Sequence, residues 1–332
     1  MRNRRIGVLA FLLVAAACGS RTGLFGPEDG AALADASVPR DGQSDGPRDA
    51  FVPDTSPTGD LDALPPIDAS PLNDVNRTDC PDAESTLVYV VTSENELHAF
   101  FPPDLGFRLI GNLTCPAPAG TSPFSMAVDR RGVAYVLYTD GALYRVSTLT
   151  AACVATTYRS GQSGFQTFGM GFAADSTSIT NERLFVADNG GGGIGIPQPS
   201  RGLAHIDTSS FLLSFVGAFA PSLPRAEFTG TADGRLFAYW PQGTTARPLG
   251  SIAEVDIRTA AVRARVDVPV GTSDDAFAFA FYGGDFWMFN STQGDTTTAV
   301  SRFRLSDGTT TTSATFGGRI VGAGVSTCAP SF

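Results

Sequence analysis

A unit of about 50 residues recurs along the chain from about residue 86, and it limits the fold more than any other feature. The second unit contains four short runs of β-forming residues, at 124–129, 133–138, 142–146 and 153–158. The third, fourth and fifth units repeat this pattern from Phe168, Phe228 and Phe277. Turn residues such as Thr139-Asp140-Gly141 separate the runs, and apolar and polar residues alternate within them. Four strands per unit at this period predict an all-β fold, a β-propeller of four-stranded antiparallel blades.

The two ends of the repeated region predict how the ring closes. The first unit has runs at 87–91, 96–100 and 107–113 but lacks an inner strand, whereas the segment 320–326 resembles the first strand of the other units. Pairing that segment with the first unit would remove an open sheet edge. We therefore predict five blades, closed by the C-terminal strand. The alternatives are a sandwich of hairpins, or a sixth blade formed near Gly190–Gly193.

The N-terminus has the form of an export signal. A basic start, Met1–Arg5, precedes an apolar run, Ile6–Ala17, of about 12 residues, which is too short to cross a bilayer as a helix. Cys18 follows directly, so residues 1–17 resemble a bacterial lipoprotein signal. The resemblance implies lipidation of Cys18 and a membrane anchor. Gly19 implies the outer membrane of a Gram-negative cell. We expect Sec export, with twin-arginine export as the alternative.

Residues 18–79 are expected to form a disordered tether between the lipidated cysteine and a propeller at 80–332. The segment is rich in Asp, Pro and Ala, and residues 27–79 contain twelve acids against three arginines. Such a composition cannot bury enough apolar surface to offset the entropy of ordering. Capture of calcium by these aspartates is the alternative, although their spacing is unlike that of a calcium loop.

The composition excludes several kinds of site. The chain has no lysine, so a Schiff-base enzyme and a P-loop nucleotide site are excluded. Its two histidines, His98 and His205, exclude a His-rich zinc site. The formal net charge is −10 and the predicted propeller has no basic excess, so nucleic acid is not an expected partner.

Four cysteines follow Cys18, and an even number in an exported chain predicts two disulfides. Three connectivities are possible. Cys80 and Cys328 flank strands that we place side by side, which favours a Cys80–Cys328 bond and leaves Cys115 with Cys153. A metal site made of these cysteines is the alternative, but no CxxC spacing supports it.

As a whole the chain resembles exported propeller lipoproteins of myxobacteria and their relatives. The resemblance rests on the segment Ala17–Leu24, the acidic Pro-rich tether and the segment Gly322–Pro330. It spans most of the chain and implies no particular activity.

Propellers bind ligands at the axis or on one face, which makes polar residues near the inner strands the candidates. Glu227, the leading candidate, lies just before the fourth inner strand, near the mouth of the expected channel, and Thr229 lies within that strand. Asp274 and Asp275 precede the fifth inner strand. The three carboxylates could together bind Ca²⁺ through oxygen ligands. Small residues dominate the inner strands, which we interpret as a consequence of crowding at the axis.

Two aromatic residues and one row of polar residues are also considered as candidates for binding. Trp240 and Tyr282 could stack on a sugar, but a core between blades explains them better. His205 aligns with Arg145, Glu254 and Arg302, a row that we interpret as a solvated face.

The function favoured by the sequence is a monomeric, membrane-anchored binding module without a cofactor, for a protein, glycan or small ligand. The alternatives are a metal-dependent propeller hydrolase of the lactonase kind and a structural scaffold subunit. The inner strands lack the Glu, Asn and Asp set expected of the hydrolase.

Overall fold

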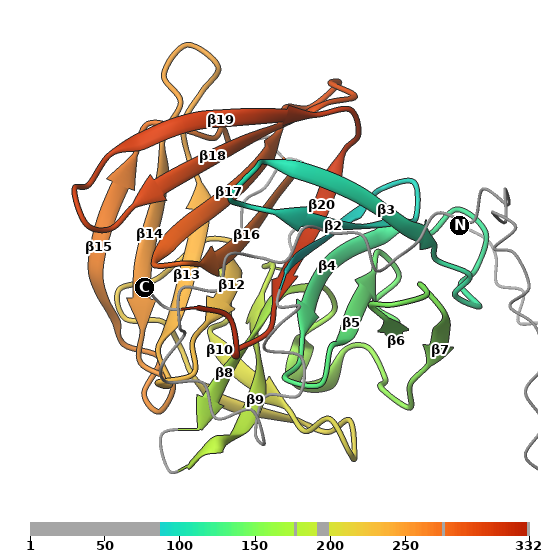
Figure 1. Cartoon of the computed structure of the whole chain (residues 1–332). Helices are drawn as coiled ribbons and strands as arrows, with labels where there is room; N and C mark the ends of the chain where they lie inside the picture. Colours follow the sequence, from blue (N-terminus) through green and yellow to red (C-terminus); the bar gives the residue numbers. More distant parts are fainter. Residues whose placement is uncertain (1–86, 176–177, 191–198, 274–275, 331–332) are drawn as a thin grey trace, which may run out of the picture. The chain divides into compact units, whose positions relative to one another are not determined.

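The computed structural model describes residues 87–175, 178–190, 199–273 and 276–330, and this part is nearly all β-structure (Figure 1). Its strands form five antiparallel sheets of four. The described residues contain one short 3-10 helix, Gln162–Gly164, and no helix long and apolar enough to cross a membrane. The predicted signal peptide and tether, with Cys18 and Cys80, lie outside the described residues.

Each sheet is one blade, whose four strands follow one another from the axis of the ring to its outer edge. Blade 1 consists of β20 (Ile320–Val325), β1 (Val88–Thr92), β2 (Glu96–Phe101) and β3 (Gly106–Asn112). Blade 2 consists of β4 (Pro123–Val128), β5 (Val133–Tyr138), β6 (Leu143–Ser147) and β7 (Cys153–Ala155). Blade 3 consists of β8 (Phe168–Asp175), β9 (Ser178–Asp188), β10 (Leu203–Ile206) and β11 (Leu213–Gly217). Blade 4 consists of β12 (Glu227–Gly230), β13 (Leu236–Pro241), β14 (Gly250–Val255) and β15 (Val262–Val268). Blade 5 consists of β16 (Ala276–Tyr282), β17 (Asp285–Ser291), β18 (Thr298–Arg304) and β19 (Thr310–Phe316).

The inner strands contact one another in the ring order β4, β8, β12, β16, β20 and back to β4. The last strand, β20, drawn in red in Figure 1, pairs antiparallel with β1, so that Val90 lies opposite Ala323. The predicted five-bladed propeller, closed by the C-terminal strand, is therefore confirmed. The sandwich and the six-bladed alternative are wrong, because the described strands make five complete sheets around one ring.

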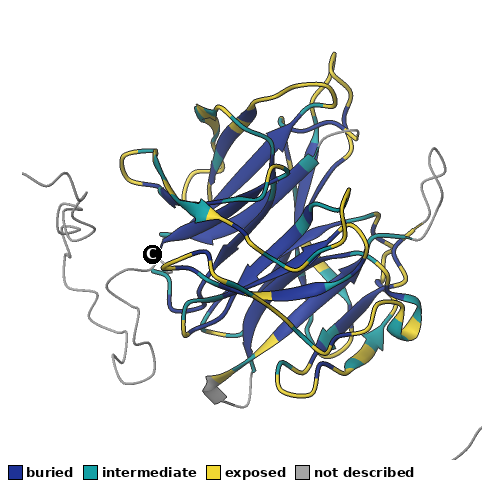
Figure 2. Cartoon of the chain, turned by 90° about the vertical axis from the view of Figure 1, so that its right-hand side faces the viewer, coloured by how far each residue is buried: buried dark blue, intermediate teal, exposed yellow. Residues whose placement is uncertain are grey.

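A separate hydrophobic cluster fills each of the five spaces between neighbouring blades. The alternation of side chains along a strand explains this arrangement. In β1, Val88 and Val90 pack toward blade 5, whereas Tyr89 and Val91 pack toward blade 2. The inner strands and their neighbours are therefore buried on both faces, and exposed residues gather on outer strands and loops (Figure 2).

Glycines allow the inner strands to approach closely at the axis. A Cβ atom added to Gly322 would lie 2.7 Å from the backbone nitrogen of Met126, and one added to Gly324 would lie 2.8 Å from that of Val128. Both distances are shorter than Cβ contacts in folded proteins. The crowding that the sequence predicted for the inner strands is confirmed at β20 and β4.

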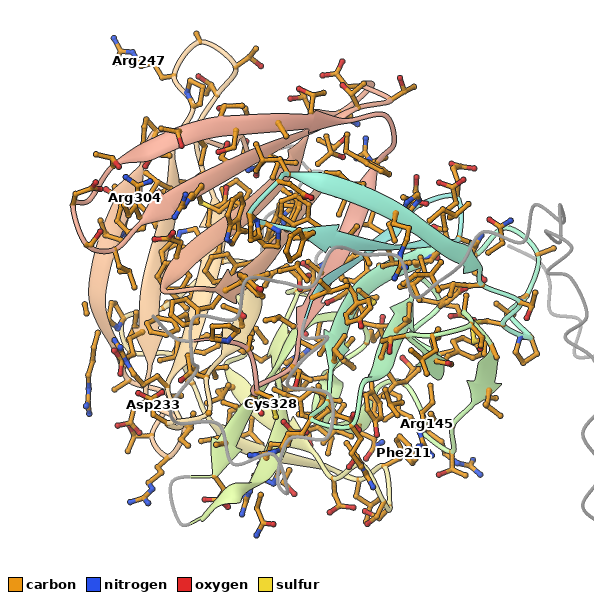
Figure 3. The ribbon with its side chains drawn as sticks, in the orientation of Figure 1. Arg145, Phe211, Asp233, Arg247, Arg304 and Cys328 are labelled. Carbon is orange, nitrogen blue, oxygen red and sulfur yellow. A yellow bond between two sulfur atoms is a disulfide. The ribbon has the colours of Figure 1, made fainter. Side chains whose placement is uncertain are left out.

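The disulfide between Cys115 and Cys153 is confirmed, and it joins the segment after β3 to the outer strand of blade 2. Cys328, labelled in Figure 3, lies just beyond the end of β20 and is also disulfide-bonded. Cys80 lies outside the described residues, so the Cys80–Cys328 bond stays a prediction.

Candidate functional site

A cavity of about 270 Å³ opens at the end of the propeller axis where the inner strands begin, and we call it the axial pocket. Its apolar lining comes from the starts of β4, β12, β16 and β20, with residues Pro123, Phe124, Ala226, Ala276, Phe277 and Val321. Its uncharged polar lining consists of Ser93, Ser122, Thr139 and Asn189. Its charged lining, within the described part of the chain, consists of Arg225, Glu227 and Arg319.

The pocket is blind, because the axis closes a short distance below its mouth. At the next level the inner strands contribute residues such as Ala127, Met170 and Gly324, and the space that remains is too small for a water molecule. The close approach of the inner strands thus leaves room for a ligand at the end where the strands begin and none midway along the axis.

Glu227 forms the floor of the axial pocket and links three blades. Its side chain is on β12, and the residue is only 5% exposed. Its Oε2 atom accepts a hydrogen bond of 2.7 Å from Ser125 Oγ on β4 and one of 3.4 Å from the backbone N–H of Met170 on β8. No described residue forms a hydrogen bond with Oε1, the other carboxyl oxygen of this pocket-lining side chain.

Burial raises the pKa of Glu227 well above its ordinary value of 4.5. The hydrogen bonds from Ser125 and Met170 and the charge of Arg225 act in the opposite direction, but desolvation is the larger effect. Burial therefore favours the uncharged acid, which can accept hydrogen bonds through one oxygen and donate one through its O–H.

Two guanidinium groups line the pocket with Glu227. Arg225 precedes β12, where it donates a hydrogen bond of 2.7 Å to the backbone oxygen of Ser273 and lies 5.0 Å from the ring centroid of Phe277. Arg319 immediately precedes β20 and is half-buried. Because arginine stays protonated at any ordinary pH, both side chains bring a permanent positive charge to the pocket.

The sequence identified Glu227 as the leading candidate but expected an acid near a channel mouth; the structure places it at the floor of the pocket. Thr229 lies deeper in β12, outside the lining of the axial pocket, and its Oγ1 accepts a hydrogen bond of 3.0 Å from the backbone N–H of Phe281. Asp274 and Asp275 lie outside the described residues, so a calcium site with Glu227 stays a prediction. The described residues contain no group of three or more His, Cys, Asp or Glu side chains that could hold a metal ion.

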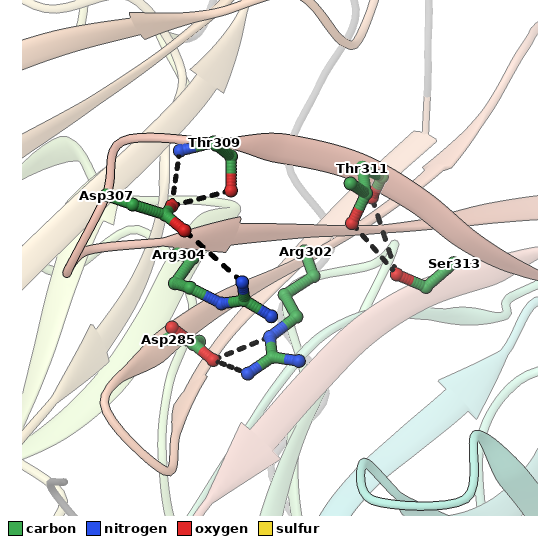
Figure 4. A network of polar contacts seen from close by, with 7 residues as sticks. All are labelled: Asp285, Arg302, Arg304, Asp307, Thr309, Thr311 and Ser313. Atoms are coloured by element: carbon green, nitrogen blue, oxygen red, sulfur yellow. Dashed lines mark hydrogen bonds and ion pairs between the residues drawn. The ribbon is translucent and has the colours of Figure 1, made fainter.

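The two aromatic residues considered for sugar binding are core residues. Trp240 and Tyr282 are buried in the clusters between blades 3 and 4 and between blades 5 and 1. The predicted polar row is in part an array of ion pairs: Glu254 pairs with Arg235, and Arg302 pairs with Asp285. Figure 4 shows the second pair beside the more exposed pair of Arg304 and Asp307.

Sequence reasoning missed another acid, Glu182 on β9, which is partly buried at the end of the axis where the inner strands finish. Its Oε1 accepts a hydrogen bond of 2.6 Å from the backbone N–H of Arg130, and its Oε2 accepts one of 2.9 Å from Thr327 Oγ1. Burial raises the pKa of Glu182 from 4.5 to about 7. Glu182 therefore ties blade 3 to the turn after β4 and to the segment after β20.

Arg225 and Arg319 were also missed. A usable signal was present, because each arginine stands one or two residues before the start of an inner strand. The hydroxyl of Ser125 gave no signal of its role, since its partner lies 102 residues further along the chain.

Comparison with known proteins finds only distant similarity to solved structures. No protein-family model and no curated protein matches the chain. Among solved structures, TolB from Acinetobacter baumannii is similar at 12% identity, with a TM-score of 0.37 over 68% of this chain and 52% of that one. Hydrazine synthase from Kuenenia stuttgartiensis is similar at 12% identity, with a TM-score of 0.37 over 67% of this chain and 64% of that one. The Dos1 propeller is similar at 11% identity, with a TM-score of 0.37 over 72% of this chain and 69% of that one. The chain thus spans only about half of TolB.

Proposed function

We propose that this protein is a lipid-anchored, extracytoplasmic binding module that takes a small ligand into the axial pocket. The observation that carries the proposal is a blind pocket whose floor is a buried carboxyl group with one oxygen, Oε1, free of hydrogen bonds to described residues. A volume of about 270 Å³ lies just below the usual range for small-molecule sites, which favours a compact ligand over a long chain.

The anchor is the part of the proposal that rests on the sequence alone. Acylation of Cys18 would hold the chain at the membrane, and the acidic segment that follows would give the propeller reach. Metabolic labelling with an alkyne fatty acid in a Gram-negative host tests this part. The wild-type protein should carry the label and sediment with membranes, and Cys18→Ser should lose both properties. An unlabelled wild-type protein would refute the anchor.

The binding part is tested by a thermal-shift screen of the purified protein against small acids, amines, sugars and nucleosides. Compounds that raise the melting temperature of the wild-type protein should fail to stabilise Thr139→Trp, because this exposed rim residue would then obstruct the mouth. Leu149→Trp is the matched control, since Leu149 is 80% exposed and lies in the β6–β7 turn, outside the pocket lining. Stabilisation that persists in Thr139→Trp would place the binding site elsewhere.

The metal-dependent hydrolase remains the competing hypothesis, and elemental analysis distinguishes the two. A stoichiometric divalent ion that is lost in Glu227→Gln would favour the hydrolase. The burial of Glu227 favours the binding module, because burial favours the uncharged form of this carboxyl group, whereas a hard cation prefers the ionised form.

A further inference from the structure

We infer that the axial pocket selects a small carboxylate with an apolar body, held by Arg319 at the rim and by the Glu227 carboxyl group at the floor. The inference rests on the proposed function, and it specifies which chemical class of ligand the pocket takes. Three features of the described lining carry it: the positive rim, the apolar wall between rim and floor, and the hydrogen-bonding floor.

The rim provides the charge that an anion needs. No described residue forms an ion pair or a side-chain hydrogen bond with the guanidinium group of Arg319, which is half-buried at the pocket wall. A planar guanidinium matches the two oxygens of a carboxylate and can bind both at once. Arg225 brings a second positive charge to the pocket lining, and this charge lowers the pKa of Glu227 against the larger effect of burial.

The wall and the floor define the rest of the ligand. The rings of Phe124 and Phe277, with Val321, form an apolar passage that suits a short hydrocarbon or a single aromatic ring. At the floor, the uncharged acid of Glu227 can donate a hydrogen bond to a hydroxyl or carbonyl oxygen. Because burial disfavours the ionised form of Glu227 at that depth, it would disfavour a second anionic group there as well, so we expect one charge, at the rim.

The test uses three compounds of nearly one shape that differ in the charge of one group: 4-hydroxybenzoate, 4-hydroxybenzamide and 4-hydroxybenzylamine. Isothermal titration calorimetry on the full chain should show binding of the carboxylate at least tenfold tighter than that of the amide, with the amine weakest. Arg319→Gln should remove most of this preference by weakening the carboxylate at least tenfold, and it should leave the affinity for the amide unchanged.

Arg247→Gln is the matched control, because Arg247 is exposed at the tip of the β13–β14 loop and does not line the pocket (Figure 3). It should bind all three compounds as the wild-type protein does.

The pH dependence of binding tests the floor of the pocket. Glu227→Gln keeps an uncharged hydrogen-bond donor there, so near pH 7 it should bind the carboxylate with the affinity of the wild-type protein. In the wild-type protein the affinity for the carboxylate should fall as rising pH ionises Glu227, and in Glu227→Gln that fall should disappear. The other charged groups of the described lining are the guanidinium groups of Arg225 and Arg319.

Equal or tighter binding of the amide or the amine would overturn the inference. A preference for the amine would point to a cation site formed by Glu227 with Asp274 and Asp275. If none of the three compounds binds, the inference fails, and the thermal-shift screen then decides the proposed function separately. If another compound stabilises the wild-type protein but not Thr139→Trp, the proposed binding module stands with a different class of ligand. If no compound does so, both proposals fail.

Discussion

Ser125 in blade 2 donates a hydrogen bond of 2.7 Å to Glu227 in blade 4, across the axis from a strand that is not its neighbour in the ring. This bond forms only when the inner strands converge, so the closed ring and the floor of the axial pocket depend on each other. Changes that open the ring should therefore also disturb the pocket.

Gly324→Val should destabilise the propeller by about 1–3 kcal/mol, the usual cost of overpacking a tight interior. The added side chain would meet the backbone of Ala127 and Val128, where β20 packs on β4. Gly317→Val is the control, since nothing lies within 4 Å of a Cβ atom at this position. Urea unfolding measures the difference. Equal stability of the two variants would mean that β20 does not pack on β4 as described.

Arg302→Ala should lower the free energy of unfolding by about 2 kcal/mol, because it leaves the carboxylate of Asp285 buried without its partner. The side chain of Asp285 is 7% exposed, and Arg302 also lies over the ring of Trp287. Arg304→Ala removes a pair with Asp307 in which both side chains are 44% exposed, and it should change stability little. Chemical denaturation of both variants tests this order, and a larger effect at Arg304 would contradict it.

Replacing both Cys115 and Cys153 by alanine should reduce stability by up to about 4 kcal/mol, according to loop-closure entropy for a separation of 38 residues. Backbone pairing joins the strands β4–β7 to one another, so we expect the double variant still to fold. Guanidinium unfolding of the variant, compared with that of the wild-type protein, measures the loss. An unchanged midpoint would show that the bond constrains little of the unfolded chain.

The fold could be predicted closely from the sequence because each repeat marks its strands and turns through residues that are near one another in the chain. Runs such as Val133–Tyr138 and turns such as Asp233-Gly234 mark the strands within each blade, and the missing inner strand of blade 1 pointed to the role of Ile320–Val325. The site was predicted only in part. The burial of Glu227 comes from β4, β8 and β12 meeting at the axis, and no local pattern reports that meeting.

Glu182 should make stability depend on pH in a defined window. Its pKa is 4.5 unfolded and about 7 folded, so between these values the folded state keeps a proton that the unfolded state has lost. The stabilising contribution of this proton is complete below pH 4.5 and is lost as the pH rises to about 7. Glu182→Gln should make the fall in stability smaller by this contribution and leave that of Glu227, whereas the exposed control Glu94→Gln should keep the whole fall. Urea unfolding at a series of pH values from 4 to 8 measures the free energy of unfolding. The same dependence on pH in the wild-type protein and in Glu182→Gln would contradict the raised pKa of Glu182.

The most direct test of the account is the ionisation of Glu227 itself, followed through the carbon-13 signal of its side-chain carboxyl group and assigned by comparison with Glu227→Gln. Because this carboxyl group forms the buried floor of the axial pocket, the account predicts a pKa well above 4.5. It further predicts a higher value when 4-hydroxybenzoate is bound, since a nearby anion and a hydrogen bond from the acid both favour the protonated form. A titration near 4.5 that the ligand leaves unchanged would contradict both the buried floor and the pocket as a binding site.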